Sequence, residues 1–161
     1  ENELRKVLEP AQLRSAKDFY GRISVVKDAL TACKTGGVHA MHDPTEGGVA
    51  GGIHEMADAA NLGVEVVREQ IVVEAETAKI CSYFKVDPLQ LISSGALLVA
   101  ADPAFADAIV ENLRRQSVRA TIIGEFTATP EQRLLKNKKE GETRRLPRPK
   151  SDHLWKALMR Q

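Results

Sequence analysis

The chain has 161 residues, of which 43% are hydrophobic and only 4% aromatic, and its formal net charge is +1. This length and composition favour one compact domain whose core is built mainly from aliphatic side chains. No apolar run approaches the roughly 18 residues of a membrane span, and the first residues lack the pattern of a secretion signal. We therefore expect a cytoplasmic protein with no membrane segment, and the few aromatic residues argue against stacking on nucleic-acid bases.

Charge is unevenly distributed along the chain. Residues 131–161 contain ten Lys or Arg and four Asp or Glu, whereas residues 1–130 contain thirteen and eighteen. A basic tail of this kind could bind RNA, and such binding would depend steeply on salt. Glu140 and Glu142 interrupt the positive charges, however, and a turn lies among them. A solvated hairpin face is therefore favoured over a nucleic-acid site.

The two cysteines, Cys33 and Cys81, both lie in apolar, helix-like surroundings. Their spacing matches neither a disulfide framework nor a zinc knuckle. We expect both to be buried, reduced thiols.

The pattern divides the chain into three segments. Residues 1–18 are polar with helical tendency and begin with Glu1 rather than Met, so we interpret them as a connector from a missing upstream domain. Residues 19–150 carry the alternating apolar runs of one domain. Residues 151–161 form a carboxy-terminal helix.

In its first half the domain alternates helices and strands. Five apolar residues at helical spacing predict an amphipathic helix that stops at Gly36 and Gly37: Ile23, Val26, Ala29, Leu30 and Cys33. A strand at 38–41 and a helix from Val49 to about 61–63 follow. Next come short β-branched runs at 64–67 and 71–73, a helix at 74–84 and a short helical turn at 87–92.

The second half begins with a continuous apolar run, residues 95–101, which predicts a central strand covered on both faces. Asp102 and Pro103 begin a helix whose buried face would carry Phe105, Ile109, Val110 and Leu113. The remaining predicted elements are a strand at 119–126, a hairpin of 133–136 with 142–146 closed near Glu140 and Gly141, and a last helix capped by Ser151 and bearing Leu154, Trp155 and Leu158. The predicted fold class is thus α/β, with helices layered on a mixed β-sheet.

One segment between the strand at 38–41 and the next helix combines polar residues with two glycines: His42-Asp43-Pro44-Thr45-Glu46-Gly47-Gly48. The first backbone amides of a helix lack partners inside it, and the helix dipole adds partial positive charge there. Gly47 and Gly48 would let an anion approach these amides. Asp43 or Thr45 could instead cap the helix, because both residue types are favoured caps. The spacing alone leaves both interpretations open.

Other polar groups give weaker signals. His54-Glu55 resembles the start of a zinc-protease helix, but Asp58 stands where the second histidine is required, so we predict no metal site. Glu55 suits an exposed helix position, with a role in a cleft as the alternative. His39 and His42 face opposite sides of their strand, and His42 is the better site candidate through hydrogen bonding to the turn. His153 is interpreted as a surface group, and no catalytic residue can be assigned.

A series of motifs in fixed order resembles one superfamily. The motifs are Val38 to Ala50, His54-Glu55-Met56-Ala57, Gly63-Val64, Asp87-Pro88-Leu89, Ser94-Gly95 and Ile122-Ile123-Gly124-Glu125. The superfamily contains aminoimidazole ribonucleotide (AIR) synthetase, also called PurM, selenophosphate synthetase, thiamine-monophosphate kinase and the hydrogenase maturation factor HypE. The resemblance covers about residues 23–146, is strongest to HypE-related proteins, and concerns their carboxy-terminal domain.

This resemblance implies a PurM carboxy-terminal fold and a glycine-rich loop at a domain cleft. Asp43, Thr45, Gly47 and Gly48 would face the phosphates of ATP, whose Mg²⁺ would be held mostly by the missing amino-terminal domain. The implied chemistry is ATP-dependent phosphorylation of a substrate oxygen, which then leaves as phosphate. The implied partners are that amino-terminal domain, a second copy of the full-length chain and a maturation factor.

Three features differ from the HypE pattern. Glu46 stands where HypE proteins have arginine, and Ser94 stands where they commonly have glutamate. The chain ends at Gln161 without the terminal cysteine that carries the thiocarbamoyl substrate of HypE. These differences support an alternative, a non-catalytic binding or assembly module that keeps the fold. In either case we expect the domain alone to be nearly inactive.

Overall fold

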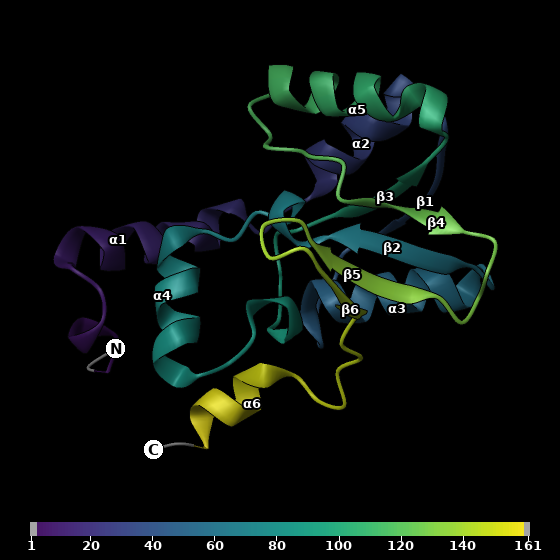
Figure 1. Ribbon diagram of the computed structural model, residues 1–161. Coiled ribbons are helices and arrows are strands. Elements are labelled where there is room, and N and C mark those ends of the chain that lie inside the picture. The colour runs from purple at the N-terminus through teal and green to yellow at the C-terminus, as the bar shows by residue number, and fades with distance from the viewer. Residues whose placement is uncertain (1–2, 160–161) are drawn as a thin grey trace.

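The computed structural model describes residues 3–159. Glu1 and Gln161, on which the inferences about the two chain ends rest, lie outside the described residues. The helices are α1 (Pro10–Asp18), α2 (Val26–Thr35), α3 (Gly48–Ala59), α4 (Ala75–Phe84), α5 (Pro103–Arg115) and α6 (His153–Leu158) (Figure 1). Within this described part, no helix has both the length and the apolar character needed to cross a bilayer.

Six strands form two sheets. They are β1 (Val38–His42), β2 (Gly63–Val67), β3 (Leu98–Ala101), β4 (Gly124–Thr127), β5 (Arg133–Asn137) and β6 (Glu142–Arg145). The larger sheet has the order β4-β2-β5-β6, in which β2 is parallel to β5 and antiparallel to β4. The predicted mixed sheet is therefore confirmed. The predicted hairpin is also confirmed, because β5 and β6 pair antiparallel.

The prediction of a central strand at 95–101 was wrong. Only residues 98–101 form a strand, β3, and it pairs with β1 alone in a two-stranded antiparallel sheet. Its alternate side chains nevertheless reach two different cores, Leu98 on one side and Val99 with Ala101 on the other. A continuous apolar run indicates that both faces of a strand are covered by other residues. It does not indicate that the strand pairs with another strand on each side.

The larger core lies between α3 and the four-stranded sheet, and the smaller one lies beneath α2 and α5 (Figure 1). The larger core is formed by Ala50, Ile53, Ala57, Val64, Val66, Ile71, Leu89, Leu135 and Leu146. In the smaller core, Ala32 of α2 faces Ile109 and Leu113 of α5.

Helix α2 presents a different face from the one its spacing suggested. Val26, Leu30 and Cys33 are exposed, whereas Ala32 is fully buried against α5. The small alanine lets the two helices approach closely, so the larger apolar side chains face outward. The prediction of a buried Cys33 was therefore wrong, while Cys81 is buried as expected.

Helix α5 begins as predicted, since the Asp102 carboxylate accepts a hydrogen bond from the Ala104 amide at 2.8 Å. Ile109 and Leu113 are buried, but Phe105 remains 40% exposed. The Phe105 ring covers Gly37 so closely that a Cβ added there would lie 2.5 Å from it. Phe105 therefore seals the turn before β1 instead of joining the core.

Two further predictions near strand and helix ends were wrong. The strand expected at 119–126 is limited to residues 124–127. The cap of α6 is Asp152, not Ser151, because the Asp152 carboxylate accepts the Leu154 amide at 2.7 Å. Both errors arise where neighbouring residues have similar local preferences and a tertiary contact selects between them.

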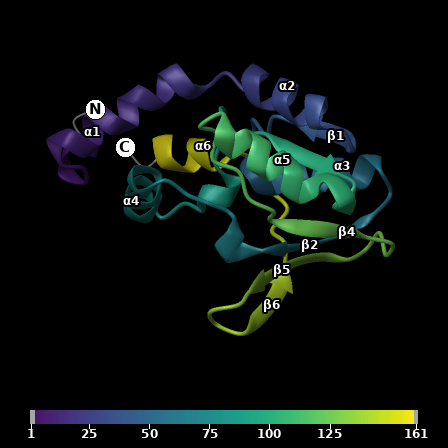
Figure 2. The same cartoon turned by 90° about the horizontal axis from the view of Figure 1, so that it is seen from above.

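Residues 4–18 do not extend away from the domain. Figures 1 and 2 both show α1 beside α4, and the two helices are in contact. The Tyr83 hydroxyl donates to Glu3 at 2.9 Å, and the Lys79 ammonium donates to Gln12 at 2.8 Å. Figure 2 also shows the β5-β6 hairpin projecting from the opposite part of the molecule.

We predict that Leu135→Ala lowers the free energy of unfolding by about 3 kcal/mol, because Leu135 is 1% exposed at the centre of the larger core. Leu158→Ala on α6 removes the same atoms from a half-exposed site and should cost less than about 0.5 kcal/mol. Urea unfolding of both variants measures the difference. Equal losses would contradict the assignment of the core.

Candidate functional site

The turn between β1 and α3 brings together the four residues predicted to face phosphate. Gly47 is the amino-terminal cap of α3 with φ of 78°, and the amide of Gly48 donates to the Thr45 carbonyl at 3.0 Å. Asp43 and Thr45 are exposed, whereas Gly47 and Gly48 are buried. The polar residues therefore line the outer side of the turn and the glycines its inner side.

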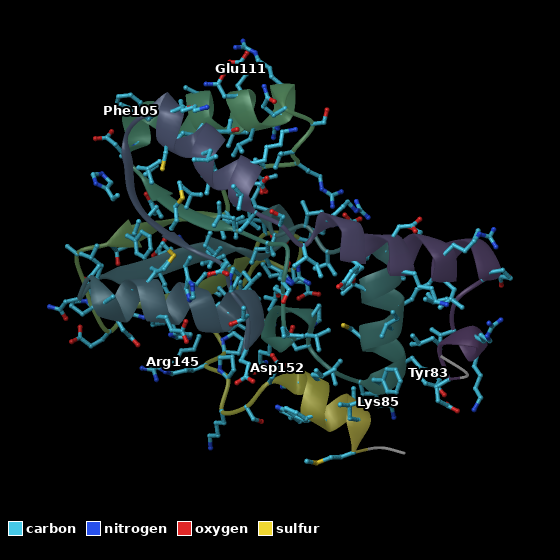
Figure 3. The ribbon with its side chains drawn as sticks, turned by 180° about the vertical axis from the view of Figure 1, so that it is seen from behind. Tyr83, Lys85, Phe105, Glu111, Arg145 and Asp152 are labelled. Atoms are coloured by element: carbon cyan, nitrogen blue, oxygen red, sulfur yellow. The ribbon has the colours of Figure 1, made fainter. Side chains whose placement is uncertain are left out.

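Neither Asp43 nor Thr45 caps α3, so the capping interpretation was wrong for these residues. Instead, the Gly47 amide donates to the Asp152 carboxylate at 2.8 Å. The second oxygen of Asp152 accepts the Leu154 amide at the start of α6. One buried carboxylate thus joins the first turns of two helices. Figure 3 labels Asp152 beside α6.

Asp152 was not singled out from the sequence. An anion does occupy the start of α3, as helix electrostatics favours, but it belongs to the chain itself. The available signal was the pair Ser151-Asp152, two favoured cap residues in succession before an apolar helix. Nothing local could reveal a contact between residues 105 positions apart.

Close approach of other segments explains why two glycines stand at this turn. A Cβ at Gly48 would lie 2.3 Å from the Leu91 carbonyl oxygen, a distance that no side chain can tolerate. A Cβ at Gly47 would lie 3.4 Å from the ring of Pro149, which is ordinary contact. Gly48 is therefore required for packing, whereas Gly47 is required mainly by its positive φ.

A histidine and two carboxylates lie beside the turn. The His42 ring pairs through Nε2 with Glu55 Oε2 at 2.5 Å, and its Nδ1 lies 4.0 Å from Asp43. His42 thus bonds to α3 rather than to the turn, and Glu55 is partnered rather than merely exposed. Such a pair can donate or accept a proton at the mouth of the turn. Among the residues described, no three His, Cys, Asp or Glu side chains are grouped to hold a metal ion.

His153 is buried, contrary to its interpretation as a surface group. Its Nδ1 accepts the Asp87 amide at 3.0 Å, which ties the start of α6 to the segment before η4 (Pro88–Gln90). The residues that follow Asp87, 89–91, approach Gly48. Helix α6 is thereby fixed to two sides of the turn.

Farther along α3, His54 and Asp58 line a hollow of about 510 Å³ beneath residues 146–148. His54 is 4% exposed, and its Nε2 lies 3.3 Å from the Leu146 carbonyl oxygen. Burial holds the pKa of His54 below its usual value. The pKa of Asp58 is lowered by hydrogen bonds from Arg148 and Arg133.

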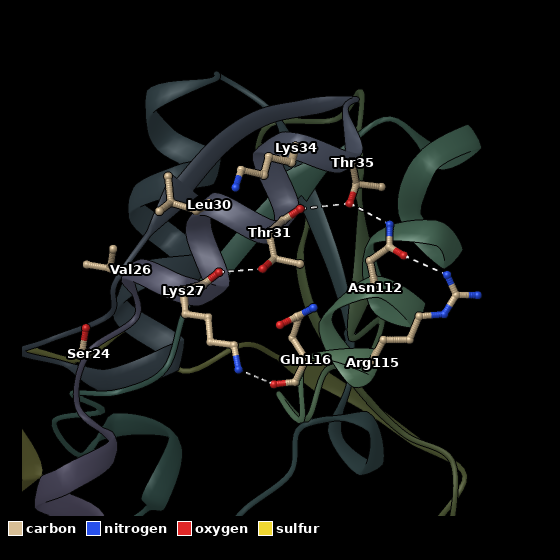
Figure 4. A pocket seen from close by; sticks show the side chains of 10 residues that line it. All are labelled: Ser24, Val26, Lys27, Leu30, Thr31, Lys34, Thr35, Asn112, Arg115 and Gln116. Carbon is tan, nitrogen blue, oxygen red and sulfur yellow. Dashed lines mark hydrogen bonds between the residues drawn. The ribbon is translucent and has the colours of Figure 1, made fainter.

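A larger hollow, of about 720 Å³, lies between α2 and α5, away from the turn (Figure 4). Most of its polar groups are already bonded to one another or to the backbone. The Asn112 amide donates to Thr35 at 3.0 Å, and the Lys27 ammonium donates to the Gln116 carbonyl. None of the four residues predicted to face phosphate lines it.

The fold and the sequence agree on a class of proteins. Residues 7–137 match the family described as AIR synthase related protein, C-terminal domain. The chain therefore belongs to this family. Its fold is that of the hydrogenase maturation protein HypE: the E. coli protein superposes on 83% of this chain with a TM-score of 0.72 at 25% identity.

Individual HypE proteins are similar to this chain in sequence or in fold. The carbamoyl dehydratase HypE of Rhizobium leguminosarum is 32% identical over 108 residues, which are 65% of this chain and 30% of that protein. The corresponding HypE of Bradyrhizobium diazoefficiens is 34% identical over 94 residues, 57% of this chain and 27% of that protein. A HypE solved in complex with ATP matches 74% of this chain and 38% of its own, with 25% identity and a TM-score of 0.67. The chain spans less than a third of the length of the Rhizobium and Bradyrhizobium relatives.

We predict that His54 makes stability depend on pH. The folded-state pKa lies below the unfolded value of about 6.5, so the unfolded state binds the proton first. The contribution of neutral His54 to the free energy of unfolding is fully present above about pH 6.5, and it is lost as the pH falls below that value. His54→Gln keeps a donor for Leu146 and should flatten the decline in thermal stability between pH 7 and 5.5.

The control is His39→Gln, because His39 is exposed on β1. It should leave the pH profile unchanged. An identical decline in His54→Gln and wild type would contradict the assignment.

Proposed function

We propose that this chain is the carboxy-terminal domain of an ATP-dependent HypE-like enzyme, in which the turn at α3 faces the phosphates. The reaction would activate a substrate oxygen by phosphorylation, in hydrogenase maturation. The observation that carries the proposal is the start of α3, where a buried backbone amide already binds a carboxylate. Membership of the AIR synthase related family and a HypE relative solved with ATP support the choice of nucleotide.

The geometry at the turn suits a phosphate oxygen. The Gly47 amide lies at a helix amino terminus, where both the amides without partners inside the helix and the helix dipole favour an anion. Asp152 stands in for that anion, since its oxygen lies at hydrogen-bond distance from the amide. The described residues offer no ligand set for Mg²⁺, which we assign to the amino-terminal domain of the same protein.

Such a domain would act with partners. Known HypE chains are longer than this one, and one of them was solved in a HypE-HypF complex. We infer an upstream ATP-binding domain, and we propose homodimerisation of the full-length chain and contact with a maturation factor. Exposed apolar side chains near the start of the described chain, Tyr20, Val26 and Leu30, support a covering partner.

One observation favours a second function, the non-catalytic module. The Gly47 amide is occupied, and the exposed Glu46 adds negative charge beside it. A domain that never exchanged Asp152 for phosphate would keep the fold and serve only in assembly. Measurement of ATP turnover separates the two functions.

We predict that Gly47→Ala in the full-length protein lowers ATP turnover about tenfold, the effect of weakening one charge-assisted hydrogen bond. The added methyl group would meet Pro149 at 3.4 Å, so the fold should survive at a cost of roughly 1 kcal/mol for the positive φ. Gly141→Ala is the matched control, because Gly141 has φ of 67° and no atom within 4 Å of the added Cβ. Unchanged turnover in Gly47→Ala would favour the assembly module.

A further inference from the structure

The segment after β6 lies along α3 and ends on the turn at its amino terminus. The Leu146 carbonyl accepts from His54, Arg148 pairs with Asp58, and Pro149 covers Gly51. Six residues after Leu146, Asp152 reaches the Gly47 amide. We call residues 147–159, which include α6, the strap. It runs from the carboxy-terminal half of α3 to its first turn.

The Asp152 carboxylate and a phosphate oxygen require the same donor. The Gly47 amide has one hydrogen, and Asp152 Oδ2 accepts it at 2.8 Å from a buried position. Pro149 lies over the same glycine and closes the approach from outside. A phosphate can therefore bind at this amide only when the strap moves away.

The contacts of the strap beyond this point are mixed: His153 of α6 is buried and accepts the Asp87 amide at 3.0 Å, whereas Arg148, Trp155 and Leu158 lie largely at the surface. Arg148 and Asp58 are both well exposed, and exposed ion pairs contribute little to stability. On α6, Trp155 and Leu158 are each 49% exposed. By contrast, Leu146 is 3% exposed within the larger core, so the chain before Pro147 is held firmly. Release of the strap therefore requires that the His153–Asp87 hydrogen bond break, but it leaves the core residue Leu146 in place.

We propose that the strap regulates the phosphate site by competition: Asp152 occupies the Gly47 amide in the closed state, and phosphate binding displaces the strap. This inference rests on the proposed function, because it supposes that the turn binds phosphate. The apparent affinity for phosphate is therefore lower than the affinity of the open state, because only the open fraction of the molecules can bind the ligand.

The test uses the protein at its full natural length, labelled with [¹⁵N]glycine so that the eleven glycines of this chain can be followed. Inorganic phosphate and Mg-ATP are titrated separately into wild type, Asp152→Asn and Asp102→Asn. Asparagine keeps the cap of α6 but removes the competing charge. Asp102 caps α5 in the same way, away from the turn, and serves as the matched control.

We expect the Gly47 and Gly48 resonances of Asp152→Asn to shift at about tenfold lower ligand concentration than in wild type, and Asp102→Asn to match wild type. Trp155 on α6, the single tryptophan of these 161 residues, reports the strap independently once its emission is identified by comparison with Trp155→Phe. Its emission should shift to longer wavelength when wild type is saturated with phosphate.

Different results overturn different statements. Equal affinity in wild type and Asp152→Asn, with shifts at Gly47 in both, would refute the strap and leave the phosphate site intact. No shift at Gly47 in any variant at millimolar phosphate or Mg-ATP would refute the phosphate role itself. A tighter Asp152→Asn with no change at Trp155 would also refute displacement of the strap.

Discussion

The contact between the Gly47 amide and the Asp152 carboxylate joins two helix starts whose residues are 105 positions apart in the sequence. Helix α3 begins with amides that its own turns cannot satisfy, and a buried amide without a partner is costly. Asp152 satisfies Gly47 and at the same time starts α6. The segment 89–91 then fits against Gly48, where only hydrogen leaves enough room. The candidate site is therefore defined by the packing of three distant segments.

Helix α3 also carries the larger core, which explains why its first turn is held so firmly. Ala50, Ile53 and Ala57 face the four-stranded sheet, while β1 leads directly into the turn. Leu98 of β3 joins the same core from the smaller sheet. A change in the position of α3 would disturb both sheets. Motion at the site is for this reason expected in the strap rather than in the helix.

Sequence predicted those features whose causes are local. Asp102 followed by Pro103 began α5 at the expected residue, and Gly36 ended α2. The hairpin and the mixed character of the sheet also followed from alternating runs and turn residues.

Features that depend on distant partners were missed. The outward face of α2 depends on how closely α5 approaches Ala32, and the burial of His153 depends on the Asp87 amide. The turn itself was identified, because glycines after a strand are a local signal. The partner of its amide lies 105 residues away, beyond the reach of any periodicity or spacing.

The charges around the turn connect its chemistry with its dependence on other parts of a longer protein. Asp43 and Glu46 are both exposed near the start of α3, so a phosphate arriving under the proposed function would meet negative side chains as well as a positive helix end. Displacement of Asp152 in the proposed open state would remove a further negative charge from the immediate site while it frees the amide. The remaining carboxylates would still require cations, and Glu46 stands where the resemblance to HypE implies an arginine. Under the proposed function, a site of this composition would gain affinity only when another domain or a bound metal ion supplied that charge, and the proposed strap would keep the amide occupied until then.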